Sequence, residues 1–349
     1  MNRLKFLDGF RGLAILLVIL YHAYSRWSPV VPYSDEFSMF PVFSNGYLGV
    51  NLFFLISGFV ILMSLEKSKD FFDFLRKRWH RLFPAMAIST ILIFFTVQFL
   101  LERPAGIPKS SSVIPGLIFI DPSWIKSTFN FDTGVLENSF WSLYVEVKYY
   151  FIFGILFFSL GRNKAVAGIF VCYFLWLIFR TFQYADIDTF NSLTSAFETL
   201  SFNRFGWFAS GSLAYLYFIS KNKKYIIYSF IAGVLSILAF GLTSKETLLA
   251  ALFILLIFLS TVYFENLKRL FANRFLIFFG FISYPLYLIH ENAMIALIVK
   301  LNKYFPGIPG ILLPVIPISF LVVVSYYIAR EIEPMVQNVI KKIPSLRPV

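Results

Sequence analysis

Long apolar stretches recur along the whole chain and are separated by shorter polar segments. An apolar run approaching 20 residues can cross the hydrocarbon core of a bilayer as an α-helix. Ten such runs can be placed, and the polar residues between them are concentrated in the connections. The pattern predicts an all-α polytopic membrane protein with about ten transmembrane helices, at residues 12–26, 47–65, 83–101, 141–160, 165–182, 205–220, 225–241, 247–264, 275–299 and 311–329.

The basic residues between these runs predict the orientation of the chain. Of the 31 Lys and Arg residues, 21 lie at the N-terminus, in the even-numbered connections or at the C-terminus. Cytoplasmic segments of membrane proteins carry an excess of Lys and Arg, so we expect both termini to be cytoplasmic. The same bias explains the net charge of +12 without a nucleic-acid partner.

Composition supports the membrane assignment. Only 14% of the 349 residues are charged and 58% are hydrophobic, whereas soluble domains carry about 25% charged residues. We expect one membrane domain over residues 1–349, with no appended soluble domain. The first run has a basic start, as a signal peptide does, but no small-residue cleavage site follows it, which favours a retained span.

Cysteine and histidine usage argues against several classes of site. Cys172 is the single cysteine and lies inside an apolar run, so the chain has no disulfide framework and no thiolate metal cluster. The three histidines (His22, His80 and His290) are in separate segments, and we predict no metal site.

The first span carries two ionisable residues, Arg11 and His22, separated by uncharged residues. Eleven residues make about three helical turns, so both side chains would share one face, about 16 Å apart. An ionisable residue within a bilayer usually has a function. The alternative is that Arg11 marks the cytoplasmic boundary and His22 reaches the far interface.

Before the third span, Arg76, Arg78 and Arg81 surround Trp79. A positive-inside cluster is one interpretation. Guanidinium groups also bind phosphate or pyrophosphate bidentately, so this cluster is a candidate site for an anionic ligand. The glycines at 46, 49 and 58, around the start of the second span, are more typical of close helix packing than of a ligand site.

The fourth and ninth spans also carry polar groups. Ser142 and Glu146 are four residues apart near the outer end of the fourth span, and Lys148 follows. Charges at that depth are costly unless they are paired or face water, so a structural ion pair is the alternative to a functional role. The ninth span contains Tyr287 and His290 after Pro285, which we expect to break the helix.

Taken together, these segments resemble the acyltransferase-3 family of bacterial integral-membrane O-acyltransferases. The resemblance rests on an ordered set of motifs that covers essentially the whole chain: Phe6–Gly12 running to His22, Gly49–Phe59, the arginines before Leu82-Phe83-Pro84, Phe140–Glu146, and Ser283–His290. Two residues depart from the family pattern. Tyr149 replaces a frequent phenylalanine, and Lys148 adds a charge close to Glu146.

The resemblance implies a ten-helix inner-membrane enzyme that transfers an acyl group, usually acetyl from acetyl-CoA, to a hydroxyl of a sugar or surface glycan. It implies catalytic roles for Arg11, His22 and Glu146. It also implies that Arg78 and Arg81 bind the acyl donor, and we include Arg76 as a candidate because it belongs to the same arginine cluster. Trp141, Ser142, Tyr287 and His290 are candidate residues for binding the acceptor. Some relatives carry an additional extracytoplasmic domain, and we expect none here.

Two chemical routes and a rival function stay open at the level of sequence. A histidine base could activate the hydroxyl for direct transfer, or His22 could carry the acyl group as an acyl-imidazole. A transporter or flippase would also place charges within the membrane, although no internal repeat relates the two halves of this chain. The expected partners are acyl-CoA, a sugar or glycan acceptor and the lipid bilayer, with no nucleic acid; the sequence does not determine the oligomeric state.

Overall fold

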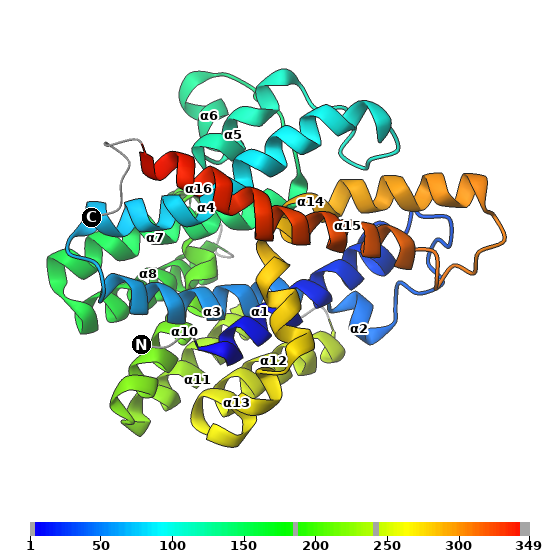
Figure 1. Cartoon of the computed structure of the whole chain (residues 1–349). Helices are drawn as coiled ribbons and strands as arrows, with labels where there is room; N and C mark the ends of the chain where they lie inside the picture. The colour runs from blue at the N-terminus through cyan, green and yellow to red at the C-terminus, as the bar shows by residue number, and fades with distance from the viewer. Residues whose placement is uncertain (1–3, 184–187, 240–243, 343–349) are drawn as a thin grey trace. The chain divides into compact units, whose positions relative to one another are not determined.

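The computed structural model describes residues 4–183, 188–239 and 244–342, and these ranges contain helices and no strand. The helices are α1 (Lys5–Tyr21), α2 (Pro41–Ser44), α3 (Leu48–Leu65), α4 (Phe71–Thr96), α5 (Val113–Ile118), α6 (Pro122–Phe129), α7 (Trp141–Leu160), α8 (Arg162–Gln183), α9 (Asp188–Thr199), α10 (Phe205–Ser220), α11 (Lys223–Ala239), α12 (Lys245–Tyr263), α13 (Glu265–Phe271), α14 (Arg274–Tyr304), α15 (Val315–Tyr327) and α16 (Glu333–Lys342) (Figure 1). Short 3₁₀ turns are η2 (Val97–Phe99), η3 (Ser110–Ser112), η4 (Asn138–Phe140) and η5 (Phe202–Arg204), and π-helical turns are η1 (His22–Arg26) and η6 (Ile328–Ile332).

The prediction of an all-α polytopic membrane protein is confirmed. In the described part of the chain, eight helical segments are long and apolar enough to cross a membrane. The sixth and seventh predicted spans correspond to α10 and α11, which have 16 and 17 residues. At about 1.5 Å per residue these helices are shorter than a hydrocarbon core of about 30 Å. Residues 240–241, at the end of the seventh predicted span, lie outside the described residues.

Helix α4 begins earlier than the hydrophobic pattern indicates. The predicted third span starts at residue 83, whereas the helix starts at Phe71 and continues through Pro84. Asp70 and Asp73 explain this start, because Asp70 accepts from the backbone N–H of Asp73, and Asp73 accepts from that of Lys69. Lys and Arg also favour helix. The arginine cluster therefore lies on a helix rather than in a loop.

The described chain divides into two compact units. The first comprises residues up to Phe10, Val50–Leu75 and Val145–Asn273. Its helices approach closely at Gly58 of α3, where a Cβ would collide with the backbone of Phe208 in α10. Hydroxyl groups link the same helices, since Ser212 donates to the carbonyl of Gly58 at 2.9 Å. The packing interpretation of this glycine is confirmed.

The second unit comprises Arg11–Gly49, Arg76–Tyr144 and the chain from Arg274 onward. Within it α14 and α15 lie side by side (Figure 1). Pro285 lies inside α14, which continues to Tyr304 and bends along its length (Figure 1). The expectation that this proline breaks the helix is therefore wrong. The hydroxyl of Tyr284 donates to the carbonyl of Leu82 in α4 at 3.0 Å, which ties the bent helix to its neighbour.

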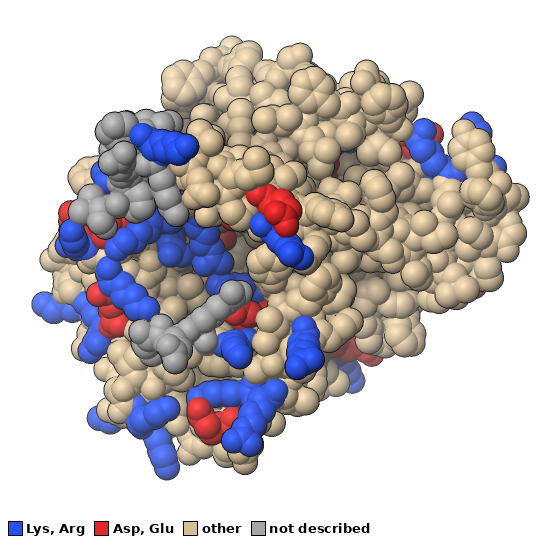
Figure 2. All heavy atoms as spheres, in the orientation of Figure 1, with Lys and Arg blue, Asp and Glu red and all other residues tan. Residues whose placement is uncertain are grey.

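Much of the surface is suited to lipid. Broad areas of the face in Figure 2 carry no charged side chain. Large apolar side chains are exposed along the spans, including Phe95 of α4 and Phe253 of α12. In water such a surface would be unstable, whereas in a bilayer it faces hydrocarbon.

Candidate active site

His22 lies at the point where the first helix changes its winding. Helix α1 ends at Tyr21, and His22 opens η1, a single π-helical turn. Such turns occur often at functional sites, because they displace a side chain from its α-helical position. The hydroxyl of Tyr33 donates to the carbonyl of Ala23, so the turn is held by a side chain from the segment that follows it.

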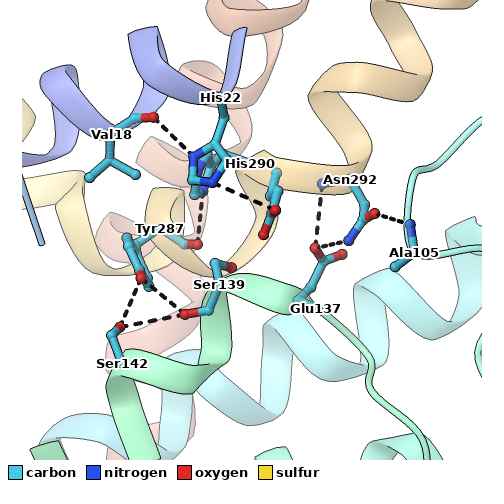
Figure 3. A network of polar contacts seen from close by, with 10 residues as sticks. Val18, His22, Ala105, Glu137, Ser139, Ser142, Tyr287, His290 and Asn292 are labelled. Atoms are coloured by element: carbon cyan, nitrogen blue, oxygen red, sulfur yellow. Dashed lines mark hydrogen bonds and ion pairs between the residues drawn. The ribbon is translucent and has the colours of Figure 1, made fainter. Parts of the chain in front are cut away.

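Two groups lie within hydrogen-bond distance of His22 Nδ1. The carbonyl oxygen of Val18 is 3.0 Å away, and Nε2 of His290 is 3.1 Å away (Figure 3). On the other side of the second ring, His290 Nδ1 lies 2.9 Å from the carbonyl oxygen of Tyr287. The sequence separates these two histidines by 268 residues, and the fold brings them into contact.

The carbonyl partners determine where the ring protons lie. A carbonyl oxygen only accepts, so Nδ1 of both rings carries a hydrogen. In its neutral form His290 then has a bare Nε2, which accepts from His22 Nδ1. His22 in turn has a bare Nε2. This is the tautomer that a general base acting through Nε2 requires.

A buried carboxylate faces that nitrogen. Glu291 Oε1 lies 3.6 Å from His22 Nε2, and the Glu291 side chain is 3% exposed, against 13% for His22. The indole of Trp27 and the backbone of Ser139 also adjoin this carboxylate. A carboxylate at this distance favours the imidazolium form, so it would stabilise His22 after proton uptake.

A second polar network adjoins the first on α14. Asn292 follows Glu291 and donates through its side-chain amide to Glu137 Oε2, while the backbone N–H of Ala105 donates to Asn292 Oδ1 at 2.8 Å (Figure 3). Arg103 Nη2 lies 3.2 Å from Glu137 Oε1 and also donates to the carbonyl of Leu136. The network fastens the segments around residues 103–105 and 137 to α14, directly after His290 and Glu291.

Burial perturbs both charged members of the second network. The Arg103 and Glu137 side chains are 2% and 1% exposed. Desolvation raises the pKa of Glu137 to about 8, although Arg103 opposes the change. Desolvation likewise lowers the pKa of Arg103 from its usual value.

A third set of contacts joins the start of α7 to α14. Ser142 Oγ and Tyr287 Oη are 2.8 Å apart, and Tyr287 donates to the carbonyl of Ser139 at 2.9 Å (Figure 3). Tyr287 also supplies the carbonyl that fixes His290. The structure therefore brings together four predicted site residues, namely His22, His290, Tyr287 and Ser142. Trp141, next to Ser142, is 40% exposed.

The other predicted residues of the second unit lie on helices α1 and α4. Arg11 is half-buried on α1, and Arg76 and Arg78 are half-buried on α4, whereas Arg81 is exposed. Arg78 and Arg81 are three residues apart on one helix, so they share a face. Glu333 of α16 is close enough to Arg81 to interact with it electrostatically.

Glu146 belongs to the first unit, and its hydrogen-bond partners are hydroxyl groups. Ser57 Oγ donates to Glu146 Oε1 at 2.7 Å, and Tyr150 Oη donates to the same oxygen at 2.6 Å. Lys148 Nζ lies 3.4 Å from Ser201 Oγ. The sequence predicts Glu146 as the carboxylate that acts with His22, but the carboxylate that the structure shows beside His22 is Glu291.

Sequence reasoning missed Arg103, Glu137, Glu291 and Asn292. Glu291 carried a usable signal, since it is an ionisable residue within the ninth predicted span. Arg103 and Glu137 fall in a long predicted outer loop, where charged residues are ordinary. Among the described residues, no group of three or more His, Cys, Asp or Glu side chains is arranged to hold a metal ion.

A comparison with known protein families matches an acyltransferase domain to residues 4–330. The match covers nearly the whole chain and includes every residue of the three networks. The chain belongs to this acyltransferase family. The resemblance inferred from the sequence motifs is thereby confirmed.

Curated relatives in Staphylococcus aureus match at lower coverage. O-acetyltransferase OatA of strain NCTC 8325 / PS 47 is 27% identical over 169 residues, which cover 45% of this chain and 25% of OatA. The protein named "Putative O-acetyltransferase SACOL0978", of strain COL, is 26% identical over 324 residues, 81% of this chain and 49% of that protein. The chain thus matches a half or less of the length of these relatives. No solved structure gives a significant match.

Proposed function

We propose that this acyltransferase is an O-acetyltransferase of the bacterial inner membrane, which moves acetyl from cytoplasmic acetyl-CoA to a hydroxyl of a sugar or exported glycan. Family membership and the names of the curated relatives support the reaction class. The observation that carries the proposal is the orientation of His22, whose Nδ1 is fixed by Val18 and His290 while Nε2 is left to act as a base.

The proposed transfer begins at the acceptor hydroxyl. His22 Nε2 removes its proton as the oxygen attacks the thioester carbonyl, the carbon–sulfur bond breaks, and coenzyme A leaves. Because His22 is the more exposed ring of the pair, it is the ring that an acceptor can reach. Glu291 would stabilise the cationic ring that this step creates.

The donor would be held at α4. Arg76, Arg78 and Arg81 present guanidinium groups along one stretch of helix, two of them half-buried and one exposed. This arrangement fits a ligand with several phosphate groups, because guanidinium binds phosphate oxygens in pairs. Arg11, Trp141 and Glu146 keep the roles that the sequence suggested for them, as predictions.

The decisive test is His22→Gln in the purified full-length protein. Glutamine keeps similar size and hydrogen bonding but cannot take a proton at neutral pH. We expect coenzyme A binding to be unchanged, while release of coenzyme A thiol from acetyl-CoA, with water as acceptor, falls by at least about 10²-fold. With Cys172 as its single cysteine, the chain adds little background to a thiol assay.

Two further measurements complete this test. Cells expressing the wild type, but not His22→Gln, should carry additional alkali-labile acetate on envelope glycans by mass spectrometry. Intact mass after incubation with acetyl-CoA alone distinguishes the routes, because an acetyl adduct that depends on His22 indicates an acyl-imidazole. Thiol release and glycan acetate that are both unchanged in the variant would refute the proposed base.

A further inference from the structure

The proposed mechanism uses His22 as a single base and does not explain why His290 contacts it. His290 is completely buried, so an acceptor cannot reach it directly. Its ring nevertheless lies 4.9 Å from the His22 ring, centroid to centroid, with one nitrogen of each ring facing the other at 3.1 Å. The backbone of α14 fixes the second ring through the carbonyl of Tyr287.

The hydrogen between the rings can belong to either nitrogen. With both rings neutral it resides on His22 Nδ1, because the carbonyl of Val18 is a second acceptor for it. When His22 Nε2 gains a proton, Nδ1 becomes more acidic, and the bare Nε2 of His290 is its strongest nearby acceptor. Two cationic rings at this distance would repel each other, so the pair holds one additional proton in total.

We propose that His290 shares the proton that His22 removes from the acceptor. This inference rests on the proposed function. As the acceptor O–H bond breaks and His22 Nε2 gains the proton, the hydrogen on His22 Nδ1 moves toward His290 Nε2. The positive charge is thereby spread over the half-buried ring of His22 and the buried ring of His290, and Glu291 balances it. The protons return along the same nitrogens to the departing sulfur, which leaves as the thiol, and both rings end neutral.

A shared proton has a physical advantage at this depth. An isolated buried cation is costly, whereas a cation spread over two rings beside a carboxylate is less so. His290 therefore acts as a positioning and proton-sharing residue behind His22. It contacts His22, but it does not contact the substrate that accepts the acyl group.

The experiment measures thiol release from acetyl-CoA, with water as acceptor, in mixtures of H₂O and D₂O. If two hydrogens move together, the rate of the wild type curves downward as the deuterium fraction rises. In His290→Gln the second hydrogen can no longer be transferred, so the plot becomes straight. The rate should also fall by about 10-fold, a part of the roughly 10²- to 10⁴-fold that general-base catalysis contributes, while the dissociation constant for coenzyme A stays unchanged.

Ser325→Ala is the matched control. Ser325 is a fully buried polar residue of the same unit, and we expect its variant to keep the curved plot. A straight plot for the wild type overturns the inference even if His290→Gln does not fold. A rate within about threefold of wild type in folded His290→Gln overturns it too. If the wild type shows no thiol release dependent on His22, the proposed function itself fails, which is a separate outcome.

Discussion

Two carboxylate sites in this chain differ in the partners that surround them, and also in burial, since Glu146 is half-buried whereas Glu137 and Glu291 are buried. In the first unit Glu146 accepts hydrogen bonds from the hydroxyls of Ser57 and Tyr150. In the second unit Glu291 faces an imidazole, and Glu137 faces a guanidinium. Hydroxyl groups solvate a charge without exchanging protons near neutral pH, whereas imidazole changes its own charge there. This difference is why the proposed function places proton transfer in the second unit.

The largest expected effect comes from removing the cation beside Glu137. Arg103→Leu leaves a carboxylate that is 1% exposed without its charged partner. At a pH above the pKa of Glu137, we expect the free energy of unfolding to fall by about 3–5 kcal/mol, measured by chemical denaturation in detergent micelles.

Lys109→Leu provides the matched control for Arg103→Leu. Lys109 pairs with Asp132 at 2.8 Å, but both side chains are more than half exposed. Solvent screens such a surface pair, so it contributes little to stability. Equal losses in the two variants would show that burial is not what distinguishes the Arg103–Glu137 pair.

The next effect concerns activity and compares the two units directly. Glu291→Gln removes the charge that faces His22 Nε2, and we expect acetyl-CoA turnover to fall by about 10²-fold. Glu146→Gln keeps an oxygen that can accept from Ser57 and Tyr150, so its loss should be smaller. A larger loss in Glu146→Gln would place the essential carboxylate in the first unit, as the sequence motifs suggest.

A pH dependence of stability follows from Glu137. Its pKa of about 8 in the folded chain lies above the usual carboxyl value, so between these two values the folded state binds a proton that the unfolded state releases. Stability should therefore fall as the pH rises through that window and level off above it. The measurement is the thermal unfolding temperature against pH, and Glu137→Gln should flatten the slope. A slope that persists in this variant would assign it to another group.

The smallest effect is expected at a hydroxyl partner in the first unit. Tyr150→Phe removes one of the two hydroxyls that donate to Glu146 Oε1 and leaves Ser57 in place. A hydrogen bond to a charged group contributes about 1.5–3 kcal/mol, and the remaining donor should keep the loss near the lower limit. Thermal unfolding of the purified variant measures it. A loss as large as that of Arg103→Leu would remove the energetic distinction between the two kinds of site.

The sequence predicts the fold class and part of the candidate site, for identifiable reasons. Long apolar runs predict the helices, and ordered motifs place His22, Tyr287 and His290 among the candidates. The start of α4 was not predicted because the first turns of this helix are rich in basic residues and do not form an apolar run. Hydrogen bonds at Asp70 and Asp73 determine where the helix begins. The apolar runs of the sixth and seventh spans are visible in the sequence. The lengths of the corresponding helices are not, because they depend on where the chain turns.

The partners of the candidate residues could not be predicted in the same way. Asn292 and Glu137 are 155 residues apart and meet only through packing. The contact of His22 with His290 likewise depends on the bend of α14 and on the π-helical turn, and periodicity encodes neither. A sequence motif identifies the histidines. The tautomers of His22 and His290 depend on the backbone carbonyl groups of Val18 and Tyr287, which only the structure shows.

The π-helical turn at His22–Arg26 also affects how this chain should be aligned with other sequences. A π-turn accommodates one residue more than the α-helical turn it replaces. A deletion within the π-turn leaves the helical residues before it in register, whereas a deletion within α1 rotates the helical residues that follow it by about 100° relative to those that precede it. A relative with regular α-helical winding at this point would therefore align with a one-residue gap just after the histidine, and an alignment without that gap would shift the residues that follow by one position.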